Sequence, residues 1–229
     1  MFISFYISLN IQNPNPIPCP NGTFSPLTGL KDVSECLLCP SGKYCSPEGG
    51  IQPAGECAPG HFCPVGTKFS DQYPCPASTF LSNSSAEDLI SCAPCISGHY
   101  CPSVGLAVPI SCPRGSFCVT GSHMPQPCPP GTYGNSTGLR RSQECLPCPG
   151  GHYCDGFGLP APTGLCDAGF YCRSRASVSA PTDGITGDIC PRGGYCPKGS
   201  TVQANCPLGT YGNSTGNRAK EDCIECDPG

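Results

Sequence analysis

The stretch that decides the fold is Cys128–Cys154, which reads CPPGTYGNSTGLRRSQECLPCPGGHYC. Its cysteines follow the spacing C-x16-C-x2-C-x5-C, and the same spacing recurs without gaps at Cys19–Cys45 and at Cys75–Cys101. A fourth copy covers Cys206–Cys226 and stops before the last cysteine of the pattern. A pattern that returns at a regular interval is the mark of a repeated structural unit, so the sequence predicts a tandem array.

The composition indicates that disulfides replace a hydrophobic core. The 229 residues include 23 cysteines, 30 glycines and 29 prolines, and only 12% are charged. Cysteine, glycine and proline therefore all exceed ordinary globular usage, and large apolar residues are too few to build one core of the expected size. Disulfides each contribute typically about 2–4 kcal/mol and persist in oxidising compartments. We therefore expect a secreted protein or one on the extracellular face of the plasma membrane.

Charge and the N-terminal sequence exclude some partners and leave others open. The net charge is −4 with scattered basic residues, which argues against nucleic acid as a partner. Met1–Ile11 is apolar but short, and it lacks a positive n-region and a small-residue cleavage site. Residues 1–18 are therefore interpreted as a signal-peptide remnant or a disordered segment, with Met1 not necessarily the true start. No apolar run reaches the ~20 residues of a membrane span, so an anchor would have to lie outside this chain.

Four repeats are expected after this N-terminal segment, with six, six, eight and three cysteines. Their predicted boundaries are 19–74, 75–127, 128–205 and 206–229. The odd cysteine total comes from the last repeat, where Cys226 is followed by Asp227-Pro228-Gly229 instead of an aromatic residue and a further cysteine. This ending predicts that the chain is a fragment.

A smaller unit, C-x2-G-x-[YF]-C, occurs seven times within the repeats. Its glycine is expected to take a positive φ in a tight turn, at Gly42, Gly60, Gly98, Gly115, Gly151, Gly169 and Gly193. Its aromatic residue is expected to pack over a neighbouring disulfide, at Tyr44, Phe62, Tyr100, Phe117, Tyr153, Tyr171 and Tyr195. The third repeat is longer because it contains an extra copy at Cys190–Cys196.

Regular secondary structure is predicted to be sparse. Short strands are expected around Thr23-Phe24, Thr79-Phe80, Thr132-Tyr133 and Thr210-Tyr211. One helical turn is expected before each C-x2-C, for example at Ala86–Leu89 after the cap candidates Ser84 and Ser85. The predicted fold class is small and disulfide-rich: an elongated tandem array of cysteine-rich modules with short β-hairpins, whose neighbours touch mainly at their ends.

The C-x2-C pairs admit three interpretations, and structural disulfides are favoured over the other two. The pairs are Cys36/Cys39, Cys92/Cys95, Cys145/Cys148 and Cys223/Cys226. A redox site would need a low-pKa thiolate at a helix N-terminus in a βαβ context, and the sequence indicates neither. Zinc would need tetrahedral sets of ligands, yet each pair lies among cysteines at other fixed spacings.

The histidines give no shared chemistry. His61, His99 and His152 precede the aromatic residue of the C-x2-G-x-[YF]-C unit, and other copies of the unit have Lys, Ser, Phe or Gly there. They are therefore interpreted as exposed turn residues. The sequence shows no catalytic set, phosphate loop or calcium loop, so we expect no enzyme activity, no cofactor and no metal.

Four N-x-[ST] sequons are candidate modification sites, at Asn21, Asn83, Asn135 and Asn213. A single tripeptide of this kind is a weak indication. Recurrence once per repeat in a disulfide-rich chain makes all four candidates for N-glycosylation.

The paired motifs C-P-x-G-T-[YF] and C-x-x-C-P-x-G-x-[YF]-C resemble extracellular cysteine-rich repeats of the growth-factor-receptor and ephrin-receptor-like type, over Cys19–Cys226. The cysteine spacing of the first repeat also resembles tumour-necrosis-factor-receptor modules. That resemblance implies first-to-second, third-to-fifth and fourth-to-sixth pairing. The implied disulfides are Cys19–Cys36, Cys39–Cys57, Cys45–Cys63, Cys75–Cys92, Cys95–Cys112, Cys101–Cys118 and Cys128–Cys145, with the rest of the third repeat ambiguous. Ala77-Ser78 departs from the family's x-Gly and puts that turn in question.

The leading functional hypothesis is a non-enzymatic extracellular region of a larger secreted or receptor-type protein, which binds an unidentified protein or matrix partner. A structural stalk or matrix spacer without a specific ligand is the alternative, and a thiol–disulfide oxidoreductase using the C-x2-C pairs is a remote third. An apolar patch exposed in one repeat alone would favour binding over spacing. Resemblance at the level of the fold identifies no ligand.

Overall fold

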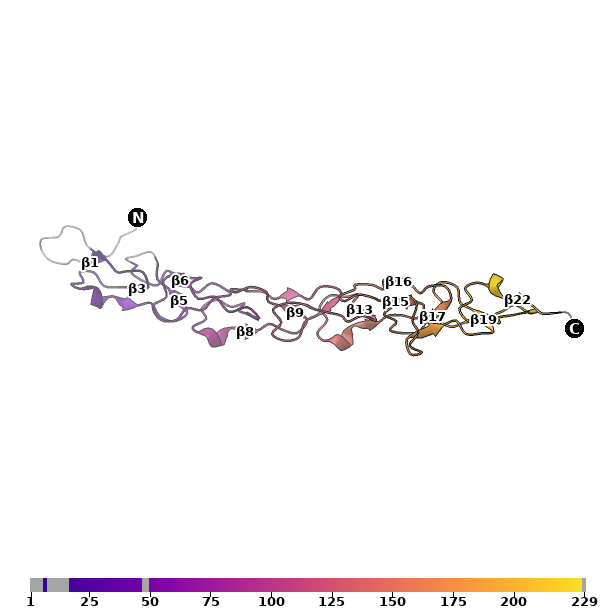
Figure 1. Ribbon diagram of the computed structural model, residues 1–229. Coiled ribbons are helices and arrows are strands. Elements are labelled where there is room, and N and C mark those ends of the chain that lie inside the picture. The colour runs from indigo at the N-terminus through magenta and orange to yellow at the C-terminus, as the bar shows by residue number, and fades with distance from the viewer. Residues whose placement is uncertain (1–5, 8–16, 47–49, 228–229) are drawn as a thin grey trace. The chain divides into compact units, whose positions relative to one another are not determined.

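The computed structural model describes residues 6–7, 17–46 and 50–227 (Figure 1). Most of the N-terminal segment 1–18, interpreted above as a signal remnant or disordered, lies outside the described residues. Within them, regular structure consists of strands of two or three residues and four single 3-10 turns, with no α-helix. Eleven disulfides hold these short elements together. The predicted small disulfide-rich fold of tandem modules is confirmed.

The strands pair two by two. The pairs are β1 (Tyr6–Ile7) with β2 (Ile17–Pro18), β3 (Thr23–Phe24) with β4 (Leu37–Leu38), β5 (Lys43–Tyr44) with β6 (Gly55–Glu56), β7 (Thr79–Phe80) with β8 (Ala93–Pro94), β9 (His99–Tyr100) with β10 (Ile110–Ser111), β11 (Ser116–Phe117) with β12 (Gln126–Pro127), β13 (Thr132–Tyr133) with β14 (Leu146–Pro147), β15 (His152–Tyr153) with β16 (Gly164–Leu165), β17 (Phe170–Cys172) with β18 (Gly187–Ile189), β19 (Gly194–Tyr195) with β20 (Ala204–Asn205), and β21 (Thr210–Tyr211) with β22 (Ile224–Glu225). β13 and β14 pair in an antiparallel arrangement, in the register that places Thr132 opposite Pro147. The four strands expected from sequence are β3, β7, β13 and β21.

The helical turns precede each C-x2-C as predicted, but they are 3-10 turns. They are η1 (Val33–Glu35), η2 (Leu89–Ser91), η3 (Ser142–Glu144) and η4 (Lys220–Asp222). In the second repeat the turn was expected at Ala86–Leu89, and this placement is wrong. Asp88 is the N-cap, and the N–H groups of Ser91 and Cys92 donate to the carbonyls of Asp88 and Leu89. Three residues between the cap and a disulfide-bonded cysteine leave room for only one i→i+3 turn.

The disulfides fall into two classes of sequence separation. Four join cysteines 17 residues apart, and these are Cys19–Cys36, Cys75–Cys92, Cys128–Cys145 and Cys206–Cys223. Seven join the two cysteines of one C-x5-C unit, 6 residues apart, and these are Cys39–Cys45, Cys57–Cys63, Cys95–Cys101, Cys112–Cys118, Cys148–Cys154, Cys166–Cys172 and Cys190–Cys196. Three of the pairs implied by the family resemblance are therefore present, each in the longer class.

The other four implied pairs are wrong: Cys39–Cys57, Cys45–Cys63, Cys95–Cys112 and Cys101–Cys118. The physical reason lies in the turn between the two cysteines of each short unit. Gly42 has φ +76°, which reverses the chain between Cys39 and Cys45 and brings their Cα atoms to 5.7 Å. That separation lies in the range of an unstrained disulfide, so each unit closes on itself. All seven glycines of the C-x2-G-x-[YF]-C unit take the positive φ predicted from sequence.

Buried sulfur replaces a continuous apolar core. Most of the cysteines in the described chain are fully buried, while large apolar side chains such as Ile90 and Leu208 remain exposed. One small cluster joins Cys166, Cys172 and Ala176, and Tyr153 packs against it. This contact confirms, for Tyr153, the expectation that the aromatic residue covers a neighbouring disulfide.

Backbone hydrogen bonds join each turn to the next one along the chain. Gly131 donates its N–H to the carbonyl of Cys154 (2.8 Å), and its own carbonyl accepts from the N–H of Cys148 (2.9 Å). The bond from Gly60 N–H to the Leu81 carbonyl (2.7 Å) links the first two expected repeats in the same way. Sequence analysis predicted contacts mainly at the module ends. Here the backbone itself carries the contact, because the turn glycines leave room for the next segment to approach.

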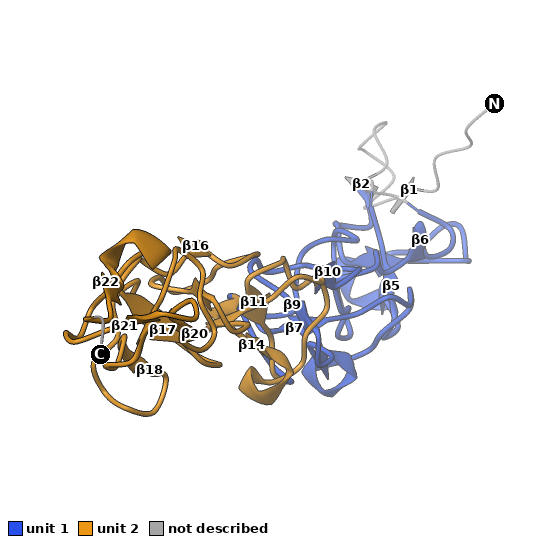
Figure 2. Ribbon diagram, turned by 90° about the vertical axis from the view of Figure 1, so that its right-hand side faces the viewer, with its two compact units in different colours: residues 1–110, 120–124 blue, residues 111–119, 125–229 orange. Residues whose placement is uncertain are grey.

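The chain forms two compact units (Figure 2). The first comprises residues 1–110 and 120–124, and the second comprises 111–119 and 125–229. The first unit contains η1 and η2, and the second contains η3 and η4. Each unit therefore has two of the four 3-10 turns.

Candidate binding surface

The 3-10 turn that precedes each C-x2-C, called a corner here, differs in sequence from repeat to repeat. The corners have the same backbone and different side chains: Val-Ser-Glu in η1, Leu-Ile-Ser in η2, Ser-Gln-Glu in η3 and Lys-Glu-Asp in η4. None of the four corners buries a residue. The disulfide that follows fixes the backbone, so the corner side chains are free to vary without loss of the fold.

Three of the corners carry a carboxylate that closes the turn. The N–H of Arg140 donates to Glu144 (2.8 Å), and the N–H of Arg218 donates to Asp222 (2.6 Å). These backbone hydrogen bonds lower the pKa of Glu144 and the pKa of Asp222. The stability that they contribute is present above the unfolded pKa and is lost as the pH falls through the lowered, folded pKa. Glu35 accepts the N–H of Lys31 (3.3 Å) in the same arrangement.

The second repeat lacks this carboxylate and has two exposed aliphatic side chains in its 3-10 turn instead. Ser91 occupies the position of the carboxylate and donates its hydroxyl to Asp88 (3.2 Å). Leu89 and Ile90 expose 54% and 90% of their surface. The two corners of the second unit have only polar or charged residues here. The exposed parts of Leu89 and Ile90 are therefore available to a partner.

Acidic residues flank this apolar pair. Glu87 and Asp88 are exposed and directly precede Leu89. The corner therefore presents two aliphatic side chains beside two carboxylates. We call the four residues Glu87–Ile90 the apolar corner.

The turn at Ala77-Ser78, put in question by the sequence, forms without glycine. Ser78 has φ +74°, close to the +78° of Gly131 at the same position of the third repeat. Its N–H donates to the carbonyl of Cys101 (2.9 Å), and its carbonyl accepts the N–H of Cys95 (2.8 Å). These two bonds hold the left-handed conformation, which costs a non-glycine residue about 1–2 kcal/mol. The second repeat thus departs from its sisters at this turn as well as at its corner.

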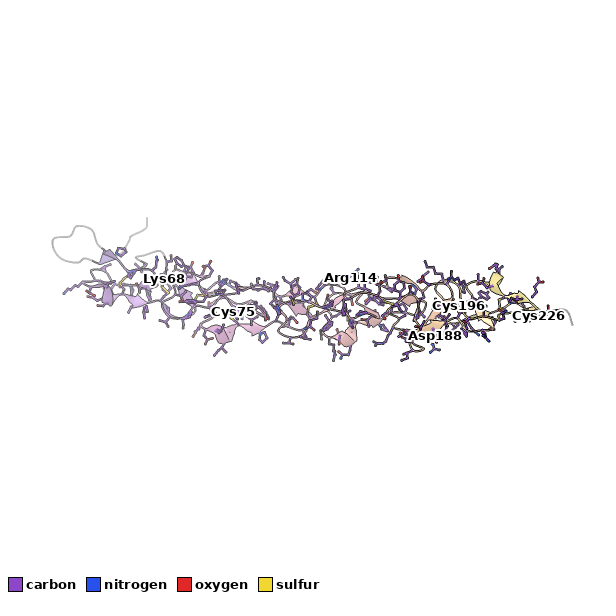
Figure 3. All side chains as sticks on the ribbon, in the orientation of Figure 1. Lys68, Cys75, Arg114, Asp188, Cys196 and Cys226 are labelled. Carbon is purple, nitrogen blue, oxygen red and sulfur yellow. A yellow bond between two sulfur atoms is a disulfide. The ribbon has the colours of Figure 1, made fainter. Side chains whose placement is uncertain are left out.

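In three of the four C-x2-C pairs the two cysteines belong to different disulfides, and in the fourth Cys223 is bonded to Cys206 while Cys226 is free. Cys145 bonds to Cys128, and Cys148 bonds to Cys154, so the pair shares no bond of its own. A thiol–disulfide enzyme cycles a bond between the two cysteines of one such pair, and this arrangement does not provide it. Cys226 is the one cysteine of the described chain outside a disulfide, and it is exposed (Figure 3).

Among the residues that the structure describes, the histidines belong to no group of three or more His, Cys, Asp or Glu side chains that could hold a metal ion. The Nδ1 atom of His61 lies 3.1 Å from the Pro59 carbonyl, and that of His152 lies 3.3 Å from the Gly150 carbonyl. Both contacts reach only two residues back along the chain. His99 and His152 begin strands β9 and β15, and all three histidines are half-buried, so the interpretation as exposed turn residues is wrong.

The four sequons lie in two kinds of structural environment, exposed loops and a half-buried turn. Asn83, Asn135 and Asn213 are exposed in the loop that follows the first strand of their repeat. Asn21 is half-buried in the turn before β3, and its Oδ1 atom is fully buried without a hydrogen-bond partner. The structure thus separates one sequon that the sequence treated as equivalent to the other three.

Sequence analysis did not identify the apolar corner, although the repeat alignment contains it. Leu89-Ile90 aligns with Ser142-Gln143 once the copies are registered on their cysteines. Its exposure was the missing information, because an aliphatic pair before a cysteine is usually a core contact.

None of the helical turns in the described part of the chain has the length and apolar character needed to cross a bilayer. The chain matches no family model. It is similar to "ABC transporter G family member 28" of Arabidopsis thaliana, with 32% identity over 127 residues. The aligned part covers 50% of this chain and 9% of that relative. The disulfide-rich repeat architecture fits an extracellular binding or structural module.

Proposed function

We propose that the chain is a non-enzymatic extracellular region of a larger secreted or receptor-type protein, and that it binds another protein in adhesion or ligand contact. The disulfides support the extracellular location, since such bonds persist in oxidising compartments. The similarity to a segment that makes up 9% of an ABC transporter supports an array of this kind as one part of a longer chain.

The observation that carries the binding proposal is the exposure of Leu89 and Ile90 on a fixed corner. The disulfide Cys75–Cys92 holds the corner next to β8, so a partner meets a preformed shape and little ordering cost arises on binding. Full burial gains about 1.5–3 kcal/mol for Ile90 and roughly half of that for Leu89, which is 54% exposed.

The chemistry of the corner defines the partner. Its aliphatic pair fits a hydrophobic pocket, and Glu87 and Asp88 fit basic residues at the rim of that pocket. The proposed partner is therefore an extracellular protein or matrix component with an apolar pocket and a basic rim.

A structural spacer without a specific ligand is the second candidate, and the second unit favours it. Its corners, Ser142–Glu144 and Lys220–Asp222, are polar and charged. Hydrogen bonds such as the one from Gly193 N–H to the Gly212 carbonyl (2.9 Å) join its turns. These features stabilise an array, and the two corners offer no apolar contact, whereas Phe157, Ile185 and Leu208 are exposed elsewhere in the second unit.

Replacing Leu89 by Ser and Ile90 by Gln tests the binding proposal, because it gives the second repeat the corner residues of the third. We expect binding of the fluorescently labelled chain to the surface of cells of its own organism, measured by flow cytometry, to weaken about tenfold or more. The fold should persist, since neither side chain is buried.

The matched control replaces Ser142 by Gln and Gln143 by Ser, at the same corner of the third repeat. It is expected to bind like the parent chain. Equal binding by the Leu89 and Ile90 variant and the parent would refute the apolar corner as the binding site and favour the spacer.

A further inference from the structure

Each sequon lies inside one of the four longer disulfide rings, and none lies in a short C-x5-C ring. The rings Cys19–Cys36, Cys75–Cys92, Cys128–Cys145 and Cys206–Cys223 enclose Asn21, Asn83, Asn135 and Asn213 respectively. We propose that Asn83, Asn135 and Asn213 carry N-linked oligosaccharides and that Asn21 is skipped, although all four have the required tripeptide. This inference rests on the extracellular location proposed above.

The reaction is transfer of an oligosaccharide from a polyprenyl diphosphate donor by the transferase of the secretory pathway. The Nδ2 atom of asparagine forms a bond to C1 of the first sugar and loses a proton. The bond from that C1 to the diphosphate oxygen breaks, and the polyprenyl diphosphate leaves. The asparagine side chain must therefore be exposed, with its tripeptide free to enter the transferase.

The three exposed sequons lie in loops whose two ends are held by backbone hydrogen bonds. Around Asn135, the N–H of Gly134 donates to the Leu159 carbonyl (2.8 Å) and that of Gly138 donates to the Cys112 carbonyl (2.8 Å). Between these anchors, residues 135–137 are exposed. Around Asn213, the Gly212 carbonyl accepts the N–H of Gly193 (2.9 Å), and the N–H of Gly216 donates to the Cys190 carbonyl (2.8 Å). An oligosaccharide on such a loop extends into solvent and leaves the anchoring bonds intact.

Asn21 lies in a turn that is held on both sides. The N–H of Gly22 donates to the Cys45 carbonyl (2.9 Å), and the Gly22 carbonyl accepts from Cys39 (2.9 Å). The next turn is so close that a Cβ atom on Gly22 would lie 2.5 Å from the Gly66 carbonyl oxygen. An oligosaccharide on Asn21 would have to extend from this contact.

The hydroxyl that completes the first sequon is also engaged. Thr23 donates its Oγ1 hydroxyl to the Pro20 carbonyl (2.7 Å), across the peptide bonds of Asn21 and Gly22. By contrast, Thr137 and Thr215 are exposed in their loops, while Ser85 of the Asn83 sequon is half-buried and hydrogen-bonds to Glu56. Because Asn21 is also only two residues from Cys19, closure of the first ring fixes the tripeptide in its turn.

Positions 26 and 130 allow a new sequon to be placed in the exposed loop of the first repeat and in the turn of the third. Pro26 is exposed seven residues after Cys19, as Asn135 is after Cys128, and Thr28 stands two residues beyond it. Pro26→Asn therefore creates an exposed-loop sequon in the first repeat. Pro130 precedes Gly131-Thr132 in the turn that corresponds to Asn21, so Pro130→Asn creates the same Asn-Gly-Thr tripeptide in the turn of the third repeat.

The experiment expresses the chain with an added secretion signal in cultured eukaryotic cells and measures occupancy at each asparagine. Occupancy is read by mass spectrometry after amidase release of the oligosaccharides. We expect attachment at Asn83, Asn135 and Asn213 and an occupancy at Asn21 lower by about fivefold or more. The Pro26→Asn variant should gain an oligosaccharide at its new site, and Pro130→Asn should not.

The outcomes separate the two proposals. Occupancy of Asn21 equal to that of the other three, or full occupancy at position 130, overturns this inference and leaves the extracellular proposal standing. No attachment at any of the four sites in the secreted chain overturns the glycoprotein assignment as a whole. Failure of the first repeat to accept sugar even at position 26 would show that its place in the chain, and not the turn, prevents attachment, and would overturn the argument from Gly22.

Discussion

Replacing Gly115 by alanine is expected to lower the free energy of unfolding by about 3 kcal/mol, and replacing Gly193 by alanine by only about 1 kcal/mol. Both glycines follow Cys-Pro-Arg in the same unit, and their φ values are +81° and +91°. The cost of a left-handed alanine is therefore common to both variants.

The difference arises from what a new methyl group would meet. At Gly115 it would overlap the carbonyl oxygen of Gly158 in the next turn, whereas at Gly193 nothing lies within 4 Å. Backbone cannot move aside as a flexible side chain can, so the Gly115 variant must separate two turns. It would strain the bond from Gly115 N–H to the Gly134 carbonyl (2.9 Å).

Guanidinium unfolding with the disulfides intact, followed by tyrosine fluorescence, measures both variants. The chain contains nine tyrosines and no tryptophan, so tyrosine is the intrinsic probe. Equal losses for the two variants would contradict the close approach of successive turns, because only the conformational cost would then remain.

Replacing Cys148 and Cys154 together by alanine is expected to destabilise the array more than replacing Cys206 and Cys223. Chain entropy alone predicts the reverse order, since the longer ring restricts the unfolded chain more, by about 0.8 kcal/mol. Local contacts should decide, because Cys148 and Cys154 are fully buried and Cys206 and Cys223 are half-buried.

The backbone around Cys148–Cys154 explains the size of the effect. The backbones of Cys148 and Cys154 make four hydrogen bonds, two of them with Gly131. In the other two, the N–H of Arg175 donates to the Cys148 carbonyl and the N–H of Cys154 donates to the Ala176 carbonyl. At about 0.5–1.5 kcal/mol each, these bonds outweigh the entropy difference. Hydrogen exchange of the Gly131 and Arg175 amides should rise in this variant and stay unchanged in the Cys206 and Cys223 variant. A larger loss of stability from the latter variant would show that loop entropy governs.

The sequence alone predicted much of the frame. The repeat spacing predicted a tandem array of small modules, whose individual boundaries stay a prediction. The turn glycines and the strands at Thr132-Tyr133 and its three counterparts follow from local chemistry that acts within a few residues. These features depend on the preference of glycine for positive φ and on the alternation of strand residues with turn residues, and both can be read directly from a sequence.

The disulfide partners could not be predicted in the same way. Cys39 lies in sequence between candidate partners on both sides, and six cysteines allow fifteen pairings. The resemblance to a receptor module suggested Cys57, but the choice depends on whether the glycine turn brings Cys45 within reach first. That is a matter of three-dimensional distance, and the structure gives 5.7 Å between these Cα atoms.

The sequence contains the residues of the candidate sites but does not show which of them are exposed. Leu89-Ile90 looks like a core contact in the sequence, and only its exposure makes it a corner available to a partner. Asn21 matches the sequon pattern as well as Asn135 does, and only the bonds on both sides of Gly22 distinguish it. In both cases burial and backbone contacts between distant turns carry the information.

Disulfide mapping by a glutamate-specific protease tests most directly the central claim that each C-x5-C unit closes on itself. The denatured, non-reduced chain is cut after Glu35, Glu48 and Glu56, and the last cut falls between Cys45 and Cys57. The fragment with Cys39 and Cys45 should then remain linked to the Cys19 fragment through Cys36 and should separate from the fragment that begins at Cys57. Recovery of Cys39 or Cys45 covalently joined to the Cys57 fragment would contradict the account.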